Sequence, residues 1–166
     1  MKTIYLVRHA KSSWSDEKLI DIERPLRSRG IIRAKAIADI LLTNRMTMDV
    51  MWTSPAQRAR DTAILFFVKL QSPQSYIDIK PDLYFTSAKK VLKSLVDLPS
   101  SCQSVGLFGH QPITGELCEL LCNKVFDNVP TAGVIKINLD IRDWSAIKPQ
   151  CGEYEAHWFA KELGID

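Results

Sequence analysis

Short apolar runs alternate with helical patterns along most of this chain, and this alternation limits the possible folds more than any other feature. Four runs have the length and the β-branched or aromatic content of strands: residues 4–7, 49–53, 76–79 and 104–108. Four segments carry apolar residues at helical spacing: residues 28–41, 54–70, 87–96 and 112–121. Strands that alternate with helices favour a largely parallel sheet flanked by helices. The sequence therefore predicts an α/β three-layer sandwich.

The last part of the chain adds strands without intervening helices. Residues 133–139 alternate apolar and polar side chains, and residues 144–148 and 153–159 are interpreted as two further strands.

His157 lies at no strand-to-helix junction, so we interpret it as a structural or surface residue. No repeat or linker interrupts the sequence, and 166 residues suffice for one hydrophobic core. We expect one domain over residues 1–166.

Composition and charge narrow the functional classes. The chain is 46% hydrophobic and 25% charged, which is typical of a soluble globular protein. No apolar segment is long enough to cross a bilayer, and the first apolar run is too short for a secretory signal. We therefore expect a cytoplasmic protein without membrane association. The 22 basic and 19 acidic residues give a net charge of +3, which is too balanced for a nucleic-acid coat but permits a local basic pocket.

The cysteine pattern gives no indication of a metal site. The sequence contains no CxxC pair, and no histidine stands at metal-ligand spacing from any of the four cysteines, Cys102, Cys118, Cys122 and Cys151. Cys118 and Cys122 lie one helical turn apart, but two thiolates without further ligands make a poor zinc site. We interpret the cysteines as reduced thiols and expect neither a metal nor a cofactor.

The first strand ends in a cationic pair, Arg8 and His9. In an open α/β sheet the connections after the strand ends form the ligand crevice, so these side chains are expected to face a site. Histidine is a nucleophile that titrates near neutral pH, and arginine binds phosphate oxygens bidentately. Taken alone, the pair favours the plainer interpretation of a charged strand end that only solvates the sheet edge. Combined with two later segments, it indicates phosphoryl transfer onto histidine.

Two later strand-to-helix junctions carry matching side chains. Ser54 and Pro55 are typical of a helix start, which predicts a helix from that point with Arg58 in its first turn. Free amides, the positive end of the helix dipole and this arginine would share one anion-binding volume, whereas Arg60 is expected to be solvated. A second histidine, His110, follows the fourth strand. Because all three junctions should open on one edge of a parallel sheet, we expect a single pocket.

The three segments form a set of motifs: Arg8-His9, Ser54-Pro55-x-x-Arg58-Ala59-x-x-Thr62, and Gly109-His110-x-Pro112. In this order and spacing the set resembles the histidine phosphatase superfamily, also called phosphoglycerate mutase-like, and the resemblance spans most of the chain. It implies a phosphoglycerate mutase-like sandwich. A chain of 166 residues leaves no room for a large capping insertion.

Two further features resemble the SixA-type phosphohistidine phosphatases within that superfamily. They are the short chain and the run from Arg8 to Trp14 followed by an Asp-x-x-Arg-Pro-Leu motif at residues 21–26. The resemblance implies that His9 is the nucleophile that takes the phosphoryl group. Arg8, Arg58 and His110 would bind its oxygens and stabilise transition-state charge.

The Asp-x-x-Arg-Pro-Leu motif supplies two more candidates. Arg24 is implied as an additional phosphate contact. Asp21 is expected to orient one of the cations or to act as an acid, and the alternative is an ordinary loop carboxylate.

The chain departs from the larger mutase-like members, which carry a glutamate as general acid after the third strand. This chain has Leu83, Tyr84 and Phe85 there. An aliphatic phosphoester needs its leaving oxygen protonated, which general acid catalysis accelerates by about 10²–10⁴-fold. Phosphohistidine needs this far less, because its imidazole departs neutral once the ring is protonated. Asp21, Glu23 or Asp82 could still supply a proton.

These observations favour a metal-independent phosphatase that works through a phosphohistidine intermediate on His9 and acts on phosphohistidine of signalling proteins. One alternative is a phosphatase for a small phosphorylated metabolite. Such an ester generally needs enclosing walls, whereas an open, shallow site admits a protein side chain. The other is a phosphate-binding module without turnover, against which stands the presence of the nucleophile, both arginines and the second histidine. No nucleic-acid partner is expected.

Overall fold

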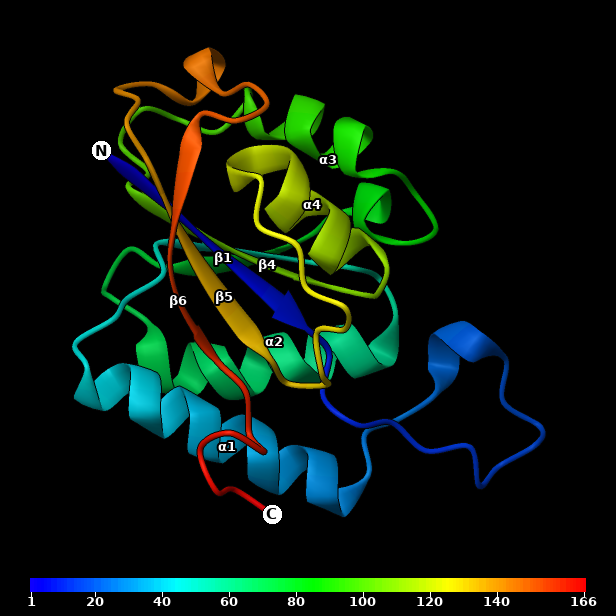
Figure 1. Ribbon diagram of the computed structural model, residues 1–166. Coiled ribbons are helices and arrows are strands. Elements are labelled where there is room, and N and C mark those ends of the chain that lie inside the picture. The colour runs from blue at the N-terminus through cyan, green and yellow to red at the C-terminus, as the bar shows by residue number, and fades with distance from the viewer.

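The computed structural model describes all 166 residues and is built around one six-stranded sheet (Figure 1). The spatial order of its strands is β3-β2-β4-β1-β5-β6. The strands are β1 (Lys2–Arg8), β2 (Val50–Thr53), β3 (Tyr76–Ile79), β4 (Ser104–Gly109), β5 (Val134–Leu139) and β6 (Gly152–Trp158). The first four strands are mutually parallel, and β5 and β6 add an antiparallel edge beside β1. The prediction of a largely parallel sheet is confirmed.

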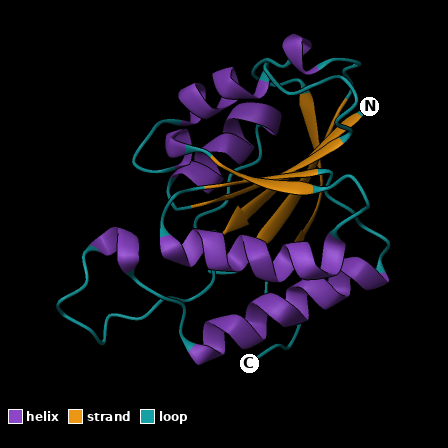
Figure 2. Ribbon diagram, turned by 180° about the vertical axis from the view of Figure 1, so that it is seen from behind, coloured by secondary structure: helices purple, strands orange, loops and turns teal.

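Two pairs of helices cover the two faces of the sheet, which gives three layers (Figure 2). The pair α1 (Ser28–Thr43) and α2 (Gln57–Leu70) covers one face, and the pair α3 (Ala88–Leu95) and α4 (Ile113–Cys122) covers the other. Strand β1 serves both layers, because alternate side chains of a strand point to opposite faces. Ile4 and Leu6 pack with α3 and α4, whereas Tyr5 and Val7 pack with α1 and α2. None of the helices is long and apolar enough to cross a membrane.

The pairing of β1 with β4 positions the site. Their parallel register ends with Arg8 opposite Gly109, so the residues that follow the two strands start from the same edge of the sheet. His9 is tied there by its backbone N–H, which donates to the Gly109 carbonyl at 2.9 Å. On the other side of β4, the backbone N–H of Ser54 donates to the Phe108 carbonyl at 2.9 Å. Three connections therefore leave the sheet side by side.

Helix α1 holds the loop after β1 in place. Its buried face consists of small and aliphatic residues at helical spacing, and at its first turn Gly30 meets the backbone of Lys11. A Cβ at position 30 would lie 2.3 Å from the Lys11 carbonyl oxygen, so only glycine permits this approach. The Arg27 N–H also donates to that carbonyl at 2.8 Å, and a bridge joins Ser12 to Leu26. These contacts fix the backbone beside His9.

The start of one predicted helix and one predicted strand are wrong. Helix α2 begins at Gln57 instead of at Ser54-Pro55, because residue 56 is still extended and the Ser54 hydroxyl is engaged elsewhere. Residues 144–148 are not a strand but contain a 3₁₀ helix, Trp144–Ala146. Trp144 is fully buried, and its Nε1 donates to the Cys102 carbonyl at 2.8 Å. The buried ring and its hydrogen bond hold this segment against the core before β6 begins.

Candidate active site

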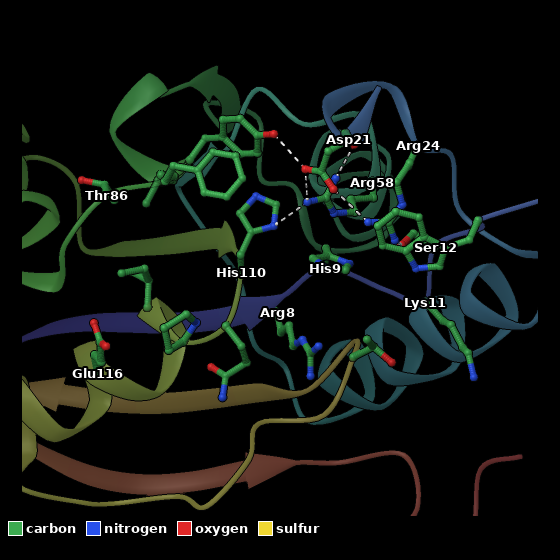
Figure 3. Close-up of a pocket in the computed structure, with 18 of the residues that line it drawn as sticks. Arg8, His9, Lys11, Ser12, Asp21, Arg24, Arg58, Thr86, His110 and Glu116 are labelled. Atoms are coloured by element: carbon green, nitrogen blue, oxygen red, sulfur yellow. Dashed lines mark hydrogen bonds and ion pairs between the residues drawn. The ribbon is translucent and has the colours of Figure 1, made fainter. Parts of the chain in front are cut away.

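All six residues predicted as site residues line one cavity of about 610 Å³ at the carboxyl ends of β1 and β4. They come from four places in the chain: Arg8 and His9 at the end of β1, Asp21 and Arg24 in the following loop, Arg58 in α2, and His110 after β4. Figure 3 shows these side chains converging from the different elements. The expected single pocket is present, at the edge where α/β sheets bind ligands.

His9 has the geometry of a nitrogen nucleophile. Its ring is 8% exposed, and Nδ1 lies 2.7 Å from the Ala10 carbonyl oxygen. Because a carbonyl only accepts, Nδ1 carries the proton and Nε2 keeps its lone pair, with no protein partner. Burial lowers the pKa of His9 to about 4, with smaller contributions from Arg58, Arg8 and Arg24 and against the Ala10 hydrogen bond, which raises it. The imidazole is therefore neutral at neutral pH.

His110 is held in the complementary orientation. Its Nδ1 lies 3.4 Å from Nη2 of Arg58, which can only donate, so Nδ1 is the acceptor. Its Nε2 then carries the proton and donates to the Ser54 hydroxyl at 2.8 Å. Burial lowers the pKa of His110 to about 3, assisted by the neighbouring His9 and Arg58. The two imidazole centroids lie 5.2 Å apart, so the unprotonated nitrogens of both rings border one small volume.

The carboxylate of Asp21 links Arg24, in the same loop, to Arg58 of α2 and to Tyr84. Its Oδ1 accepts from Arg24 at 2.9 Å, and its Oδ2 accepts from Arg58 at 3.0 Å and from the Tyr84 hydroxyl at 2.8 Å. Its backbone carbonyl accepts a second bond from Arg58, at 2.7 Å. Burial raises the pKa of Asp21, but the hydrogen bonds from Tyr84, Arg58 and Arg24 outweigh it and bring the pKa to about 2. Asp21 is thus an ionised carboxylate, which orients arginines and has no proton to give.

The two arginines nearest His9 present unpaired donors. Arg58 is 6% exposed, and its Nε is buried without a partner, as is the Nε of Arg8. Arg8 binds the chain through Nη1, which donates to the Val129 carbonyl at 2.8 Å. Buried donors without partners are rare because each costs about 1–3 kcal/mol, and both arginines that carry them also line the cavity. Arg60, two residues from Arg58, is exposed and lines no part of the cavity.

Arg24 is engaged by the protein more fully than the other arginines. Its Nε donates to the Ser13 carbonyl at 3.2 Å, its Nη2 to the Ser12 hydroxyl, and its Nη1 to Asp21. The ring of Trp14 stacks on the guanidinium at 3.3 Å. These contacts favour Arg24 as a support of the Asp21 network, and a direct phosphate contact by Arg24 stays a prediction.

The other acids considered from the sequence lie elsewhere. Glu23 does not line the cavity, and Asp82 binds Lys90 and Ser94. The only carboxylates that line the cavity are Asp21 and Glu116.

Sequence reasoning missed several residues of the site. Thr62 accepts a hydrogen bond from the Ala10 N–H at 2.9 Å, and Ser54 accepts from His110. Both stand inside the Ser-Pro-x-x-Arg-Ala-x-x-Thr stretch, which was the available signal. Tyr84 was noted only as the residue where an acid was absent. Glu116 lies in the first turn of α4, directly after the His110 segment, and its position in that turn could have drawn attention to it.

The chain contains no group of three or more histidine, cysteine, aspartate or glutamate side chains that could hold a metal ion. The Sγ atoms of Cys118 and Cys122 lie 3.7 Å apart on α4, and all four cysteines are free thiols.

Comparison with known proteins agrees with this architecture. The sequence profile of the histidine phosphatase superfamily (branch 1) matches residues 4–83. An uncharacterised protein of Mycobacterium tuberculosis is 26% identical over 155 residues, which cover 87% of this chain and 94% of that protein.

Solved structures share the fold. The protein histidine phosphatase SixA in complex with tungstate superimposes with a TM-score of 0.83 at 22% identity, covering 97% of this chain and 99% of that one. A mycobacterial glucosyl-3-phosphoglycerate phosphatase superimposes with a TM-score of 0.67 at 13% identity, covering 94% and 98%. The profile of the histidine phosphatase superfamily thus matches the first part of the chain, and the chain as a whole has the fold of the SixA structures.

Proposed function

We propose that this protein is a metal-independent phosphatase that transfers a phosphoryl group from phosphohistidine to Nε2 of His9 and then to water. The observation that carries the proposal is the state of His9. Its Nδ1 proton is fixed on the Ala10 carbonyl, its pKa is about 4, and it lines a cavity together with Arg8 and Arg58. A neutral, oriented imidazole beside an anion site is what nucleophilic attack on phosphorus requires.

In the first step the phosphoryl dianion lies against Arg8, Arg58 and His110. Arginine donors placed around phosphorus stabilise the charge that spreads over its oxygens in the transition state. Binding of a dianion beside His110 also favours protonation of its Nδ1, which then changes from an acceptor for Arg58 into a donor to a phosphoryl oxygen. Nε2 of His9 forms the new P–N bond, and the bond to the leaving group breaks with its electron pair on that group.

In the second step water attacks the phosphoryl group on His9. The P–N bond to Nε2 breaks with its electrons returning to the ring, and phosphate and one proton are released. The Ala10 carbonyl keeps the ring in the same tautomer throughout, so that Nε2 is again free after hydrolysis.

The chemistry of the leaving group favours phosphohistidine as the substrate. Asp21 is ionised and bonded to two arginines, and the Tyr84 hydroxyl donates to Asp21. Neither is placed to protonate an aliphatic alkoxide, whose departure is slow without an acid. A phosphohistidine ring that is already protonated leaves as neutral imidazole and needs no such donor.

A phosphatase for a small phosphorylated metabolite is the second candidate, and the cavity volume favours it. About 610 Å³ lies within the usual range of small-molecule sites, and Trp14, Tyr84 and Phe85 contribute walls. The glucosyl-3-phosphoglycerate phosphatase named above shares the fold.

A substrate panel separates the two candidates. We expect kcat/KM for a phosphohistidine peptide to exceed that for phosphoserine and sugar phosphates by more than about 10²-fold, the range of the general acid effect. The protein is assayed after extensive chelator treatment, which should leave turnover unchanged. A sugar phosphate or phosphoglycerate that is turned over faster than phosphohistidine would replace the first candidate by the second.

A further inference from the structure

The cavity has two ends of different charge. Asp21, Arg24 and Arg58 gather at one end, Thr86 and Glu116 lie at the other, and His110 stands between them (Figure 3). The cations of the cavity also include Lys11 and Arg27, which belong to the segments beside His9. With a phosphoryl group at the arginine end, the part of the cavity left for the leaving group includes the end that carries Glu116.

Glu116 is the one carboxylate of the cavity without a partner. Asp21 is compensated by two arginines, whereas the side chain of Glu116 makes no ion pair and no hydrogen bond in the structure. It projects from the first turn of α4, whose backbone is fixed there by the bond from the Glu116 N–H to the Pro112 carbonyl at 3.0 Å. This turn directly follows the segment that holds His110, so the backbone of Glu116 has a fixed position beside that segment, while its side chain is exposed.

The cavity that Glu116 lines also has aromatic walls. Phe85 lines the same cavity, is 84% exposed and packs on Tyr84 with ring centroids 4.2 Å apart. Its backbone has φ of +48°, a conformation that costs a bulky residue energy and is found most often at functional sites. A flat cation is the kind of group that an aromatic face and a free carboxylate bind together.

We propose that Glu116 is a specificity residue that accepts a hydrogen bond from a planar, cationic leaving group linked to phosphorus through nitrogen. The inference rests on the function proposed above and names its substrate class. For phosphohistidine, the carboxylate accepts from the ring N–H that is not bonded to phosphorus. It thereby keeps the ring protonated while Nε2 of His9 forms its bond to phosphorus and the old P–N bond breaks toward the ring. The ring departs as neutral imidazole and retains its N–H.

The same carboxylate acts against acidic leaving groups. A phosphorylated metabolite that carries its own carboxylate would bring two like charges together at this end of the cavity, which is unfavourable. Phosphoarginine has a planar, nitrogen-linked cation as well, so the chemistry of Glu116 fits both phosphohistidine and phosphoarginine. Measuring the two substrates in parallel shows which one the site prefers.

The experiment compares Glu116→Gln and Glu116→Lys with the matched control Glu119→Gln. Glu119 lies on the same helix, is exposed and does not line the cavity. Each protein is assayed with phosphohistidine and phosphoarginine peptides and with nitrophenyl phosphate, whose leaving group carries no positive charge. A charged hydrogen bond to a partly solvated group corresponds to a factor of about 3–10 in kcat/KM.

We expect Glu116→Gln to lower kcat/KM for the preferred nitrogen-linked substrate and to raise it for nitrophenyl phosphate, because a negative charge near an incoming dianion is removed. The ratio of kcat/KM for the nitrogen-linked substrate to kcat/KM for nitrophenyl phosphate should fall at least about fivefold in Glu116→Gln, and further in Glu116→Lys. The alkaline limb of the kcat profile should move to lower pH in Glu116→Gln, because the carboxylate raises the pKa of the bound substrate ring. Glu119→Gln should match the wild type in every assay.

Two outcomes distinguish failure of the Glu116 assignment from failure of the proposed function. If the wild type hydrolyses the nitrogen-linked substrate and Glu116→Gln keeps the substrate ratio and the pH profile of the wild type, the assignment of Glu116 is wrong and the proposed function stands. If the wild type turns over nitrophenyl phosphate but neither nitrogen-linked substrate, the proposed function itself fails, and this assignment fails with it. Equal losses on all substrates in Glu116→Gln would also contradict a specificity role.

Discussion

The Tyr84 hydroxyl donates a 2.8 Å hydrogen bond to Oδ2 of Asp21, a residue 63 positions away in the sequence. Oδ2 also accepts from Arg58, so Tyr84 and Arg58 share one carboxylate oxygen. Tyr84 stands where larger relatives carry their general acid. In this chain the Tyr84 hydroxyl is bonded to the carboxylate that binds the arginines. Under the proposed function it supplies no proton, and the chemistry of the leaving group then decides the substrate.

Tyr84→Phe tests that relationship. Loss of a partly buried hydrogen bond to a charged acceptor costs about 1.5 kcal/mol, and a share of that cost should appear as a kcat/KM about 3–10-fold lower. Tyr76→Phe is the matched control, since Tyr76 lies on the edge strand β3 and outside the cavity. An unchanged kcat/KM in Tyr84→Phe would show that Asp21 is held without it. A loss of about 10³-fold would instead indicate that Tyr84 takes part in proton transfer.

The pKa of Asp21 predicts a pH dependence of stability. Hydrogen bonds bring this pKa from 3.8 to about 2, so the ionised carboxylate stabilises the folded protein above the unfolded value. That contribution is lost as the pH falls from 3.8 toward about 2, where the carboxylate becomes protonated in the folded state as well. The melting temperature of Asp21→Asn should be below that of the wild type at neutral pH, and the gap should shrink over this acid range. A gap that is constant across the range would mean that ionisation of Asp21 is not coupled to folding.

Arg58 and Arg60 differ in burial and so should differ in anion binding. Phosphate or tungstate at about 100 times its Kd should stabilise the wild type by roughly 2.7 kcal/mol and raise its melting temperature accordingly. Arg58→Ala should lose this ligand-induced shift, whereas Arg60→Ala should keep it, because Arg60 is exposed and lies outside the cavity. The shift is measured as the difference with and without ligand for each variant. Similar losses in both variants would place the anion on another surface.

If neither Asp21 nor Tyr84 protonates the leaving group, the rate should depend steeply on the leaving group. Across phosphoesters of graded leaving-group pKa at fixed pH, kcat/KM should fall strongly as that pKa rises. Asp21→Asn should lower the rates without flattening the slope, because Asp21 is ionised and does not protonate the leaving group. A flat dependence in the wild type that becomes steep in Asp21→Asn would identify Asp21 as a hidden acid. The small-metabolite candidate would then take precedence.

The parts of the site that could be predicted from the sequence are those fixed by strand ends. Arg8, His9 and His110 follow parallel strands, and parallel strands end on one edge, so their convergence needed no tertiary information. Ser54 was misread as a helix cap because its hydroxyl binds His110, a contact that local pattern does not reveal. The bond of Tyr84 to Asp21 joins two loops, and Trp144 becomes a 3₁₀ turn through burial against β-sheet neighbours. Each of these depends on packing between distant segments, which periodicity does not encode.

We expect His9 to become phosphorylated during turnover. The direct measurement is a rapid quench, under alkaline conditions, of the protein mixed with labelled phosphohistidine, followed by peptide mapping of the label. His9→Ala is the test variant, and His157→Ala is the matched control because His157 binds Tyr154 and Glu162 away from the cavity. We expect acid-labile, base-stable phosphate on His9 in the wild type and in His157→Ala, with neither label nor turnover in His9→Ala. Label on Ser12 or a cysteine, or turnover retained by His9→Ala, would contradict it.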